Sequence, residues 1–408
     1  MARRARCGLS EAVPRLRLMG RYRGGQKPWE QDDPKGRRLD PAQYPELNAV
    51  FYTADPAEFI KMRIESLSLM ACSDDQLAPL YGTDRTIGAA YLGAMAPPTS
   101  EARQRYIRME AVTISNHASE TLLRMFFAHT EHPECPWLGM SASTDFREYK
   151  AKLDAALDAG FDREQIATVF LGGTSRVDAV VQLTDDEFED AVDALAMLLI
   201  DCANRVLGDA FVYNAVKHGV SAVAVDDDEA KVSWQPMDGE PVTIHEGPVH
   251  VYLHRKGHPD AAKNEAHWWL TMEDSNPGRE LAVSVLITKA LDSLWDVARR
   301  RYLGESGSIT YISKAAVEIA VWGTTMQAMN LLKRATHELI KVKPDGTVDG
   351  TDHRIVGYRI PRPWSPERAA PAMVIRPVPL PARERDRQLV STGRRSYLPI
   401  TPRGFQRG

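Results

Sequence analysis

The sequence predicts an α+β fold that is mainly α, in which a helical bundle carries a small antiparallel β-sheet insertion. Apolar residues recur at the spacing of helical faces along most of 56–218 and again along 279–341. Between these segments, 219–275 holds short β-branched or aromatic runs separated by Asp, Gly and Pro turns. These runs form one block and do not alternate with helices, so we expect an inserted sheet rather than a parallel α/β sheet.

The chain divides into five predicted parts by composition and pattern. A basic disordered arm precedes a helical bundle, the sheet follows, further helices pack on the bundle, and a Pro/Arg-rich disordered tail comes last. Gly or Pro interrupts any periodicity in both terminal parts, and proline removes a backbone donor and blocks helix formation. The predicted boundaries are 1–45, 46–218, 219–275, 276–360 and 361–408.

The net charge of −4 conceals an uneven distribution along the chain. The arm 1–45 has a net charge of +6 and the tail 361–408 a net charge of +7, which leaves −17 on the body between them. An acidic body repels phosphate at long range. The composition therefore excludes a general nucleic-acid-binding protein, although it allows a local basic groove.

Four helices are predicted before the sheet, each from apolar residues three or four positions apart. The second ends where Pro133 and Pro136 bracket a turn. The third stops at Gly160, and a capping box over 184–187 begins the fourth. The fourth is apolar on most sides, so we expect it to be buried on most sides. The predicted ranges are 56–72, 101–130, 145–159 and 185–218.

Five strands are predicted after the central helix, because short β-branched or aromatic runs there are bounded by turn residues. Helical periodicity returns in two segments, and one further strand closes the body. The predicted strands are 220–225, 231–235, 241–245, 249–254 and 266–272, with a last one within 354–360; the later helices are 279–303 and 310–341.

Cysteine and histidine spacing argue against a metal site, and we expect no cofactor. The 4 cysteines form no Cys-x-x-Cys pair, which excludes a zinc-ribbon or thioredoxin-type site and fits a reduced, cytoplasmic protein. His250 and His254 share a strand face about 13 Å apart, too far to bind one zinc ion together. We interpret these two, together with His245, His258 and His267, as exposed strand histidines. No apolar run reaches the roughly 18 residues of a membrane span.

A run of polar residues closes the long central helix. Asn214, Lys217 and His218 lie within five positions at the end of an apolar segment. An unpaired polar group in an apolar setting costs roughly 1–3 kcal/mol. The run therefore marks either a functional site or a satisfied polar network.

A second polar set lies on the helix predicted over 101–130, where four residues separate Arg124 from His129. This Arg-x4-His spacing and the Asn214-x-x-Lys217-His218 run resemble the HEPN superfamily of helical domains, many of which are metal-independent ribonucleases of toxin and antiphage systems. The resemblance covers about 100–220 of the chain.

The HEPN resemblance implies that these five residues form a catalytic site. A histidine would move a proton at the ribose 2′-hydroxyl or at the leaving oxygen, while an arginine stabilises phosphate charge. It also implies RNA as a partner and a groove where two copies of the chain meet, in a bacterial-type protein of a toxin or phage-defence module. A homodimer and a ribonuclease, or a degenerate relative of one, are the corresponding expectations.

An alternative interpretation makes the same residues structural. Glu120 and Arg124 are an i,i+4 pair of opposite charge, and Asn214 and His218 share another helix face. Two such sets can interlock as a satisfied polar core between packed helices. The chain would then be a non-enzymatic structural or protein-interaction protein. The exposure and partners of Arg124, His129 and His218 distinguish the two interpretations.

Overall fold

The computed structural model divides into two compact units, residues 1–43 and 44–408. In the first unit only residues 39–43 are described, and they include the short 3-10 helix η1, Pro41–Gln43. All elements below belong to the second unit. The described residues are 39–141, 145–208, 210–217, 222–225, 231–234, 239–257, 266–322, 332–339, 341–342, 345–349, 353–357, 373–387 and 394–407.

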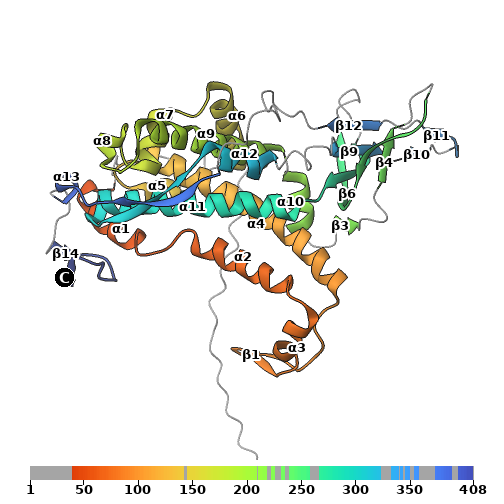
Figure 1. Ribbon diagram of the computed structural model, residues 1–408, viewed down its shortest axis with the longest axis horizontal. Helices are drawn as coiled ribbons and strands as arrows, with labels where there is room; N and C mark the ends of the chain where they lie inside the picture. The colour runs from red at the N-terminus through yellow and green to blue at the C-terminus, as the bar shows by residue number, and fades with distance from the viewer. Residues whose placement is uncertain are drawn as a thin grey trace, which may run out of the picture. The chain divides into compact units, whose positions relative to one another are not determined.

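The mainly α prediction is confirmed, and long helices form the centre of the second unit (Figure 1). Helix α4 packs against both α9 and α11, and α2 packs along α4. The helices are α1 Tyr44–Phe51, α2 Glu58–Met70, α3 Asp74–Tyr81, α4 Ser100–Glu131, α5 Pro136–Ser141, α6 Phe146–Ala159, α7 Arg163–Ile166, η2 Ala167–Leu171, α8 Arg176–Ala179, α9 Asp185–Gly208, α10 Ala210–Lys217, α11 Pro277–Leu303, α12 Lys314–Trp322 and α13 Glu384–Arg387.

Local capping signals explain where these helices begin. The backbone N–H of Glu187 donates to the Thr184 hydroxyl at 3.1 Å, and the Thr184 N–H donates back to the Glu187 carboxylate at 2.9 Å. This confirms the predicted capping box of α9. The helix predicted over 185–218 is nevertheless two elements, because α9 ends at Gly208 and α10 begins at Ala210. Glycine has a low helix propensity, which favours an end there.

The core lies where α4, α9 and α11 meet η2. Phe126 of α4 stacks on Phe170 of η2 with ring centroids 5.9 Å apart. Burying one large apolar side chain stabilises the fold by about 1.5–3 kcal/mol. Side chains with no exposed surface that belong to this core include Leu122, Leu123, Leu198, Leu199, Leu291 and Leu294.

A five-stranded antiparallel sheet follows the helical part, in the order β12-β9-β7-β6-β3. The prediction of an antiparallel sheet is confirmed, but the sheet is not confined to 219–275, since β9 and β12 come from later in the chain. The strands described are β1 Arg85–Ile87, β2 Ala90–Leu92, β3 Ala222–Val225, β4 Lys231–Trp234, β5 Val242–Glu246, β6 Val249–Gly257, β7 Ala266–Asp274, β8 Gly307–Ile312, β9 Leu332–Glu338, β10 Lys341–Val342, β11 Val348–Asp349, β12 His353–Gly357, β13 Ile375–Leu380, β14 Arg394–Ser396 and β15 Phe405–Arg407.

The helix predicted over 310–341 is wrong at both of its ends. Ile309 and Tyr311 of β8 are buried at alternate positions, which is the periodicity of a strand. At the other end, β9 pairs with both β7 and β12, and Ala335 is buried between them. Among the described residues of this range, those of α12 are helical. Pairing with distant strands overrode the local helical pattern.

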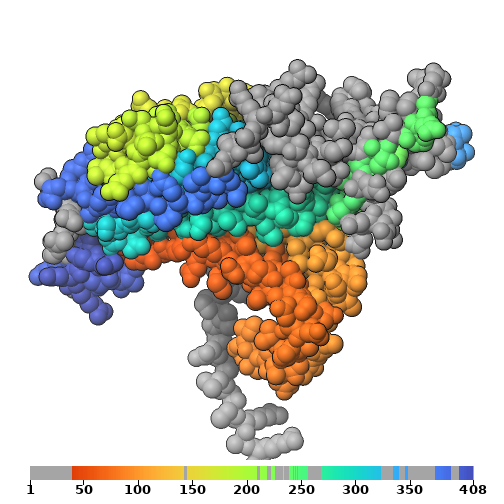
Figure 2. Space-filling model, viewed as in Figure 1, coloured from red at the N-terminus to blue at the C-terminus, as the bar shows by residue number. Residues whose placement is uncertain are grey.

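The prediction of a solvated tail over 361–408 requires a correction at β13. This strand pairs antiparallel with β8, and its Val378 and Leu380 have no exposed surface. Pro377 and Pro379 alternate with them and point away from the core, which an edge strand allows. Figure 2 shows the segment that contains β13, in blue, lying along the helical part of the second unit.

Side-chain bonds hold the same C-terminal segment in place. The Arg376 guanidinium lies 2.7 Å from the Glu187 carboxylate, and Arg383 donates to the Gly172 carbonyl at 2.9 Å. The rest of the predicted tail is described only in 373–387 and 394–407, and the predicted arm only from residue 39 onward. Within the described part of the chain, no helix is both long and apolar enough to cross a bilayer.

Candidate functional site

Arg124 and His129 lie on α4 with separate sets of partners. The Arg124 Nε atom is 2.7 Å from Oε1 of Glu120, and its guanidinium lies 4.4 Å from the centre of the Tyr149 ring. His129 is 8% exposed. Its Nδ1 donates to the Met125 carbonyl at 2.7 Å, and its Nε2 accepts a 3.0 Å bond from the Tyr52 hydroxyl.

These contacts define the protonation state of His129. A carbonyl only accepts, so Nδ1 carries the proton and Nε2 is the acceptor. Burial lowers the pKa of His129 to about 4, the bond to the Met125 carbonyl opposes this, and the nearby Arg301 adds to the lowering. The ring is therefore neutral at pH 7, with both nitrogens occupied.

The structure does not bring Arg124 and His129 to one cleft. Five positions along an α-helix correspond to about 140° of rotation, so the two side chains leave α4 on different faces. The cleft beside His129 is not lined by Arg124. The Arg-x4-His spacing therefore does not produce a shared site within the described chain.

Asn214 and Lys217 do meet part of the α4 set, in a cleft of about 260 Å³ that we call the α10 cleft. Asn116 and Glu120 of α4 line its opposite wall. Lys217 lies 5.6 Å from the centre of the Tyr213 ring, and no carboxylate of the described residues pairs with it. The remaining lining residues are Phe146, Val206 and Tyr213.

His218, the last of the five predicted site residues, lies outside the described residues. Asn116 was missed by sequence reasoning, because nothing distinguishes it from other polar residues on α4. Its amide donates to the Val112 carbonyl at 3.0 Å, and its side chain is 5% exposed. It reaches the cleft only because α10 folds against α4.

A buried cluster of charges lies behind the α10 cleft, and Asn116 also lines the small cavity of about 20 Å³ within it. Arg205 of α9 pairs with Glu280 of α11, and Nη2 of Arg279 is 3.1 Å from Oε1 of Glu280. Burial opposes ionisation of Glu280, but Arg205 and then Arg279 outweigh it and hold its pKa at about 2. The cluster thus consists of paired charges that join distant elements.

His250 of the five-stranded sheet lines this buried cluster, and His245 of the separate β4–β5 pair is buried as well. His245 is 2% exposed and His250 is 1% exposed, so the interpretation as exposed strand histidines is wrong for both. His250 Nε2 is 3.5 Å from the Ser275 hydroxyl, and burial lowers its pKa to about 4. His254 is half-buried and bonds to the Thr271 hydroxyl at 2.8 Å.

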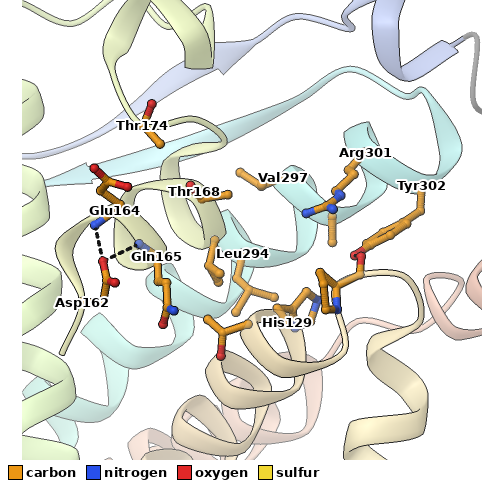
Figure 3. A pocket seen from close by; sticks show the side chains of 14 residues that line it. His129, Asp162, Glu164, Gln165, Thr168, Thr174, Leu294, Val297, Arg301 and Tyr302 are labelled. Carbon is orange, nitrogen blue, oxygen red and sulfur yellow. Dashed lines mark hydrogen bonds between the residues drawn. The ribbon is translucent and has the colours of Figure 1, made fainter. Parts of the chain in front are cut away.

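A larger cleft of about 330 Å³ lies beside His129, and we call it the His129 cleft. It opens between the C-terminal end of α4, the α7–η2 segment and α11 (Figure 3). Val297 and Ala298 of α11 form an apolar floor, with the fully buried Leu294 beneath it. Its lining further includes Thr130, Pro133, Asp162, Glu164, Gln165, Thr168, Val169, Thr174, Arg301 and Tyr302.

The charged residues of the His129 cleft lie at its two ends. Figure 3 shows Arg301 and Tyr302 at one end, with Asp162 and Glu164 at the other. The sequence contained no signal for this cleft except His129, because its walls come from three segments that are distant along the chain. Within the described residues, no group of three or more His, Cys, Asp or Glu side chains could hold a metal ion.

No protein-family model, curated protein or solved structure matches this chain. The geometry of the clefts is therefore the basis for the functional argument.

Proposed function

We propose that this protein is a non-enzymatic binding protein that holds a small organic ligand in the His129 cleft. The observation that carries the proposal is the cleft itself, about 330 Å³ in volume with an apolar floor and polar ends. Small-molecule sites in proteins typically measure about 300–1,000 Å³ and combine apolar walls with a few polar groups that orient the ligand.

The state of His129 supports binding without catalysis. A general acid or base at neutral pH needs a pKa near the working pH and a free nitrogen toward the substrate. Burial instead lowers the pKa of His129 to about 4, and Tyr52 and Met125 occupy its two nitrogens. We therefore assign His129 to the wall of the cleft.

The α7–η2 wall adds a second line of support. Residues Ala167–Leu171 form a π-helix, and Thr168 of this segment lines the cleft. π-helical turns are rare and occur frequently at functional sites. The turn ends at Gly172 with φ +89°, a left-handed conformation that favours glycine.

A crystallographic screen with a set of small organic fragments tests the proposal. We expect fragments to occupy the His129 cleft, and we expect Ala298→Phe, which places a ring on the floor, to abolish that occupancy. Fragments bound elsewhere with the His129 cleft always empty would contradict the proposal.

A second candidate function is the HEPN-like one, a metal-independent ribonuclease or degenerate relative acting on RNA as a homodimer in a toxin or phage-defence module. The α10 cleft favours it, because Asn214 and Lys217 of the HEPN-like run meet Asn116 and Glu120 there. Lys217 would supply positive charge for phosphate. The described cysteines are free thiols, which suits the cytoplasmic location that both proposals assume.

Incubation of the purified protein with single-stranded RNA, with and without EDTA, separates the two functions. The first proposal predicts no cleavage. Metal-independent cleavage that Lys217→Ala abolishes, and that the exposed control Arg395→Ala leaves intact, would favour the second. Cleavage that vanishes in His129→Ala would contradict the wall assignment of His129 directly.

A further inference from the structure

Opposite charges stand at opposite ends of the His129 cleft, and neither is neutralised. Arg301 is exposed, lies 5.4 Å from the centre of the Tyr302 ring, and has no carboxylate partner among the described residues. Glu164 is exposed at the other end and pairs with no cation of the described chain. Figure 3 shows the two side chains separated by the apolar floor.

Asp162 sets the position of the acidic end but is itself engaged. Its carboxylate accepts from the backbone N–H of Glu164 at 2.8 Å and of Gln165 at 3.2 Å, which caps α7. These two bonds, both to Oδ1, fix the first turn of the helix that carries Glu164. Glu164 has neither carboxylate oxygen in such a bond, so it is the acid that we assign to the ligand.

The apolar floor runs along α11 for about two helical turns and ends at Arg301. Leu294, Val297, Ala298 and Arg301 follow the i, i+3, i+4, i+7 pattern of one helix face. Seven residues of α-helix rise about 10 Å. A free α-amino acid carries its amine and carboxylate on a single carbon and does not extend along such a floor, whereas an extended dipeptide measures about 7 Å.

The wall opposite the floor offers polar groups for the middle of such a ligand. Gln165 and Thr168 line the cleft between its ends and are three positions apart on the same wall (Figure 3). Their side chains have no hydrogen-bond partner among the described residues, so both are available to a peptide group. An amide and a hydroxyl can each donate and accept, which matches the N–H and C=O of a peptide bond.

We propose that the ligand of the His129 cleft is a short peptide, held as a zwitterion with its C-terminal carboxylate on Arg301 and its N-terminal amine on Glu164. Its side chains rest on the floor of α11, and its central amide bonds to Gln165 and Thr168. A bidentate contact between guanidinium and carboxylate gives directional recognition at one end. This inference rests on the proposed function and adds the chemical class of the ligand.

Isothermal titration calorimetry with three dipeptides, Ala-Ala, Leu-Ala and Ala-Leu, tests the proposal. We expect at least one to bind, and we expect its N-acetylated form, its C-terminal amide and free leucine each to bind at least tenfold more weakly. Arg301→Gln should lower the affinity for the free dipeptide at least tenfold and erase the preference for a free carboxylate. Glu164→Gln should erase the preference for a free amine.

Arg147→Gln and Glu148→Gln are matched controls, since both side chains are exposed on α6 and line no described cleft. Neither should change the binding of the dipeptides. An unfolding midpoint equal to that of the wild-type protein in a thermal scan shows that each variant is folded. The proposal would be overturned if acetylation of the amine and amidation of the carboxylate both left the dipeptide affinity unchanged, or if Arg301→Gln and Glu164→Gln both did. The absence of binding by all three dipeptides would overturn it as well.

The two proposals fail in distinguishable ways. If fragments fill the His129 cleft while no dipeptide binds, the peptide inference is wrong and the binding function stands. If neither fragments nor dipeptides enter the cleft, both are wrong.

Discussion

Replacing His129 and Tyr52 separately and together tests whether their hydrogen bond stabilises the fold. Tyr52 is 1% exposed and its hydroxyl donates to Nε2 of His129 at 3.0 Å. His129→Leu leaves that hydroxyl buried without its acceptor, which costs roughly 1–3 kcal/mol. Tyr52→Phe leaves Nε2 without its donor and should cost about 1 kcal/mol.

The double variant removes both polar groups, so no orphaned partner remains. We expect its loss in free energy of unfolding to be smaller than the sum of the two single losses by about 1–2 kcal/mol, which is the coupling energy of a close pair. Urea unfolding, followed by circular dichroism, measures the free energy of unfolding of all four proteins. Tyr149→Phe is a matched control, because the buried Tyr149 hydroxyl has no hydrogen-bond partner among the described residues.

The control should cost little or nothing, since it removes an unsatisfied polar group. Additive losses, with a coupling energy near zero, would refute the claim that His129 and Tyr52 support one another. A His129→Leu variant as stable as the wild type would refute it more broadly.

Three further predictions concern the same body of the protein. The folded-state pKa of His129, about 4, lies below the ordinary 6.5, so between these pH values the unfolded chain binds a proton that the folded protein does not. The free energy of unfolding should therefore be at its full value above pH 6.5 and fall by about 3 kcal/mol as pH falls toward 4. Urea unfolding at several pH values, with His129→Leu as the reference, measures this loss. Arg300 has no exposed surface and bonds to the carbonyls of Ala179 at 2.6 Å and Gly172 at 2.9 Å, so Arg300→Met should cost at least about 2 kcal/mol in the same assay, and a neutral result would contradict this. Trypsin should not cut after Arg383 in the folded protein, because its side chain is partly buried and donates to the Gly172 carbonyl at 2.9 Å; mass spectrometry of early digests that finds this cut would contradict the docking of the C-terminal segment.

Most of the helical part was predictable because its signals are local. Apolar periodicity, the capping box at Thr184 and the stop at Gly160 each act over a few residues, and the structure has α9 and α6 where they indicate. The fold of the C-terminal segment was less predictable. Alternation of proline with Val378 and Leu380 suits an edge strand as well as a solvated tail, and only the presence of β8 decides between them.

The clefts were not predictable, because the chain brings their residues together over long separations. Arg205 lies 3.6 Å from Asp201, four positions away on the same helix, but its other partner Glu280 lies 75 residues away. Likewise, Arg301 and Glu164 share a cleft only through the packing of α11 against η2. Such contacts depend on the packing of the whole fold. Periodicity and capping signals act over a few residues and do not indicate which distant residues will meet.

An NMR pH titration of the His129 ring in isotopically labelled protein, with its signal assigned from the spectrum of His129→Leu, decides whether this histidine is a fixed part of the cleft wall. We expect the ring to stay neutral at pH 7, with the proton on Nδ1, and to titrate with a pKa of about 4. A pKa near or above the ordinary value of about 6.5 would show a histidine free to exchange protons, and it would contradict the assignment of His129 to the wall of a binding cleft.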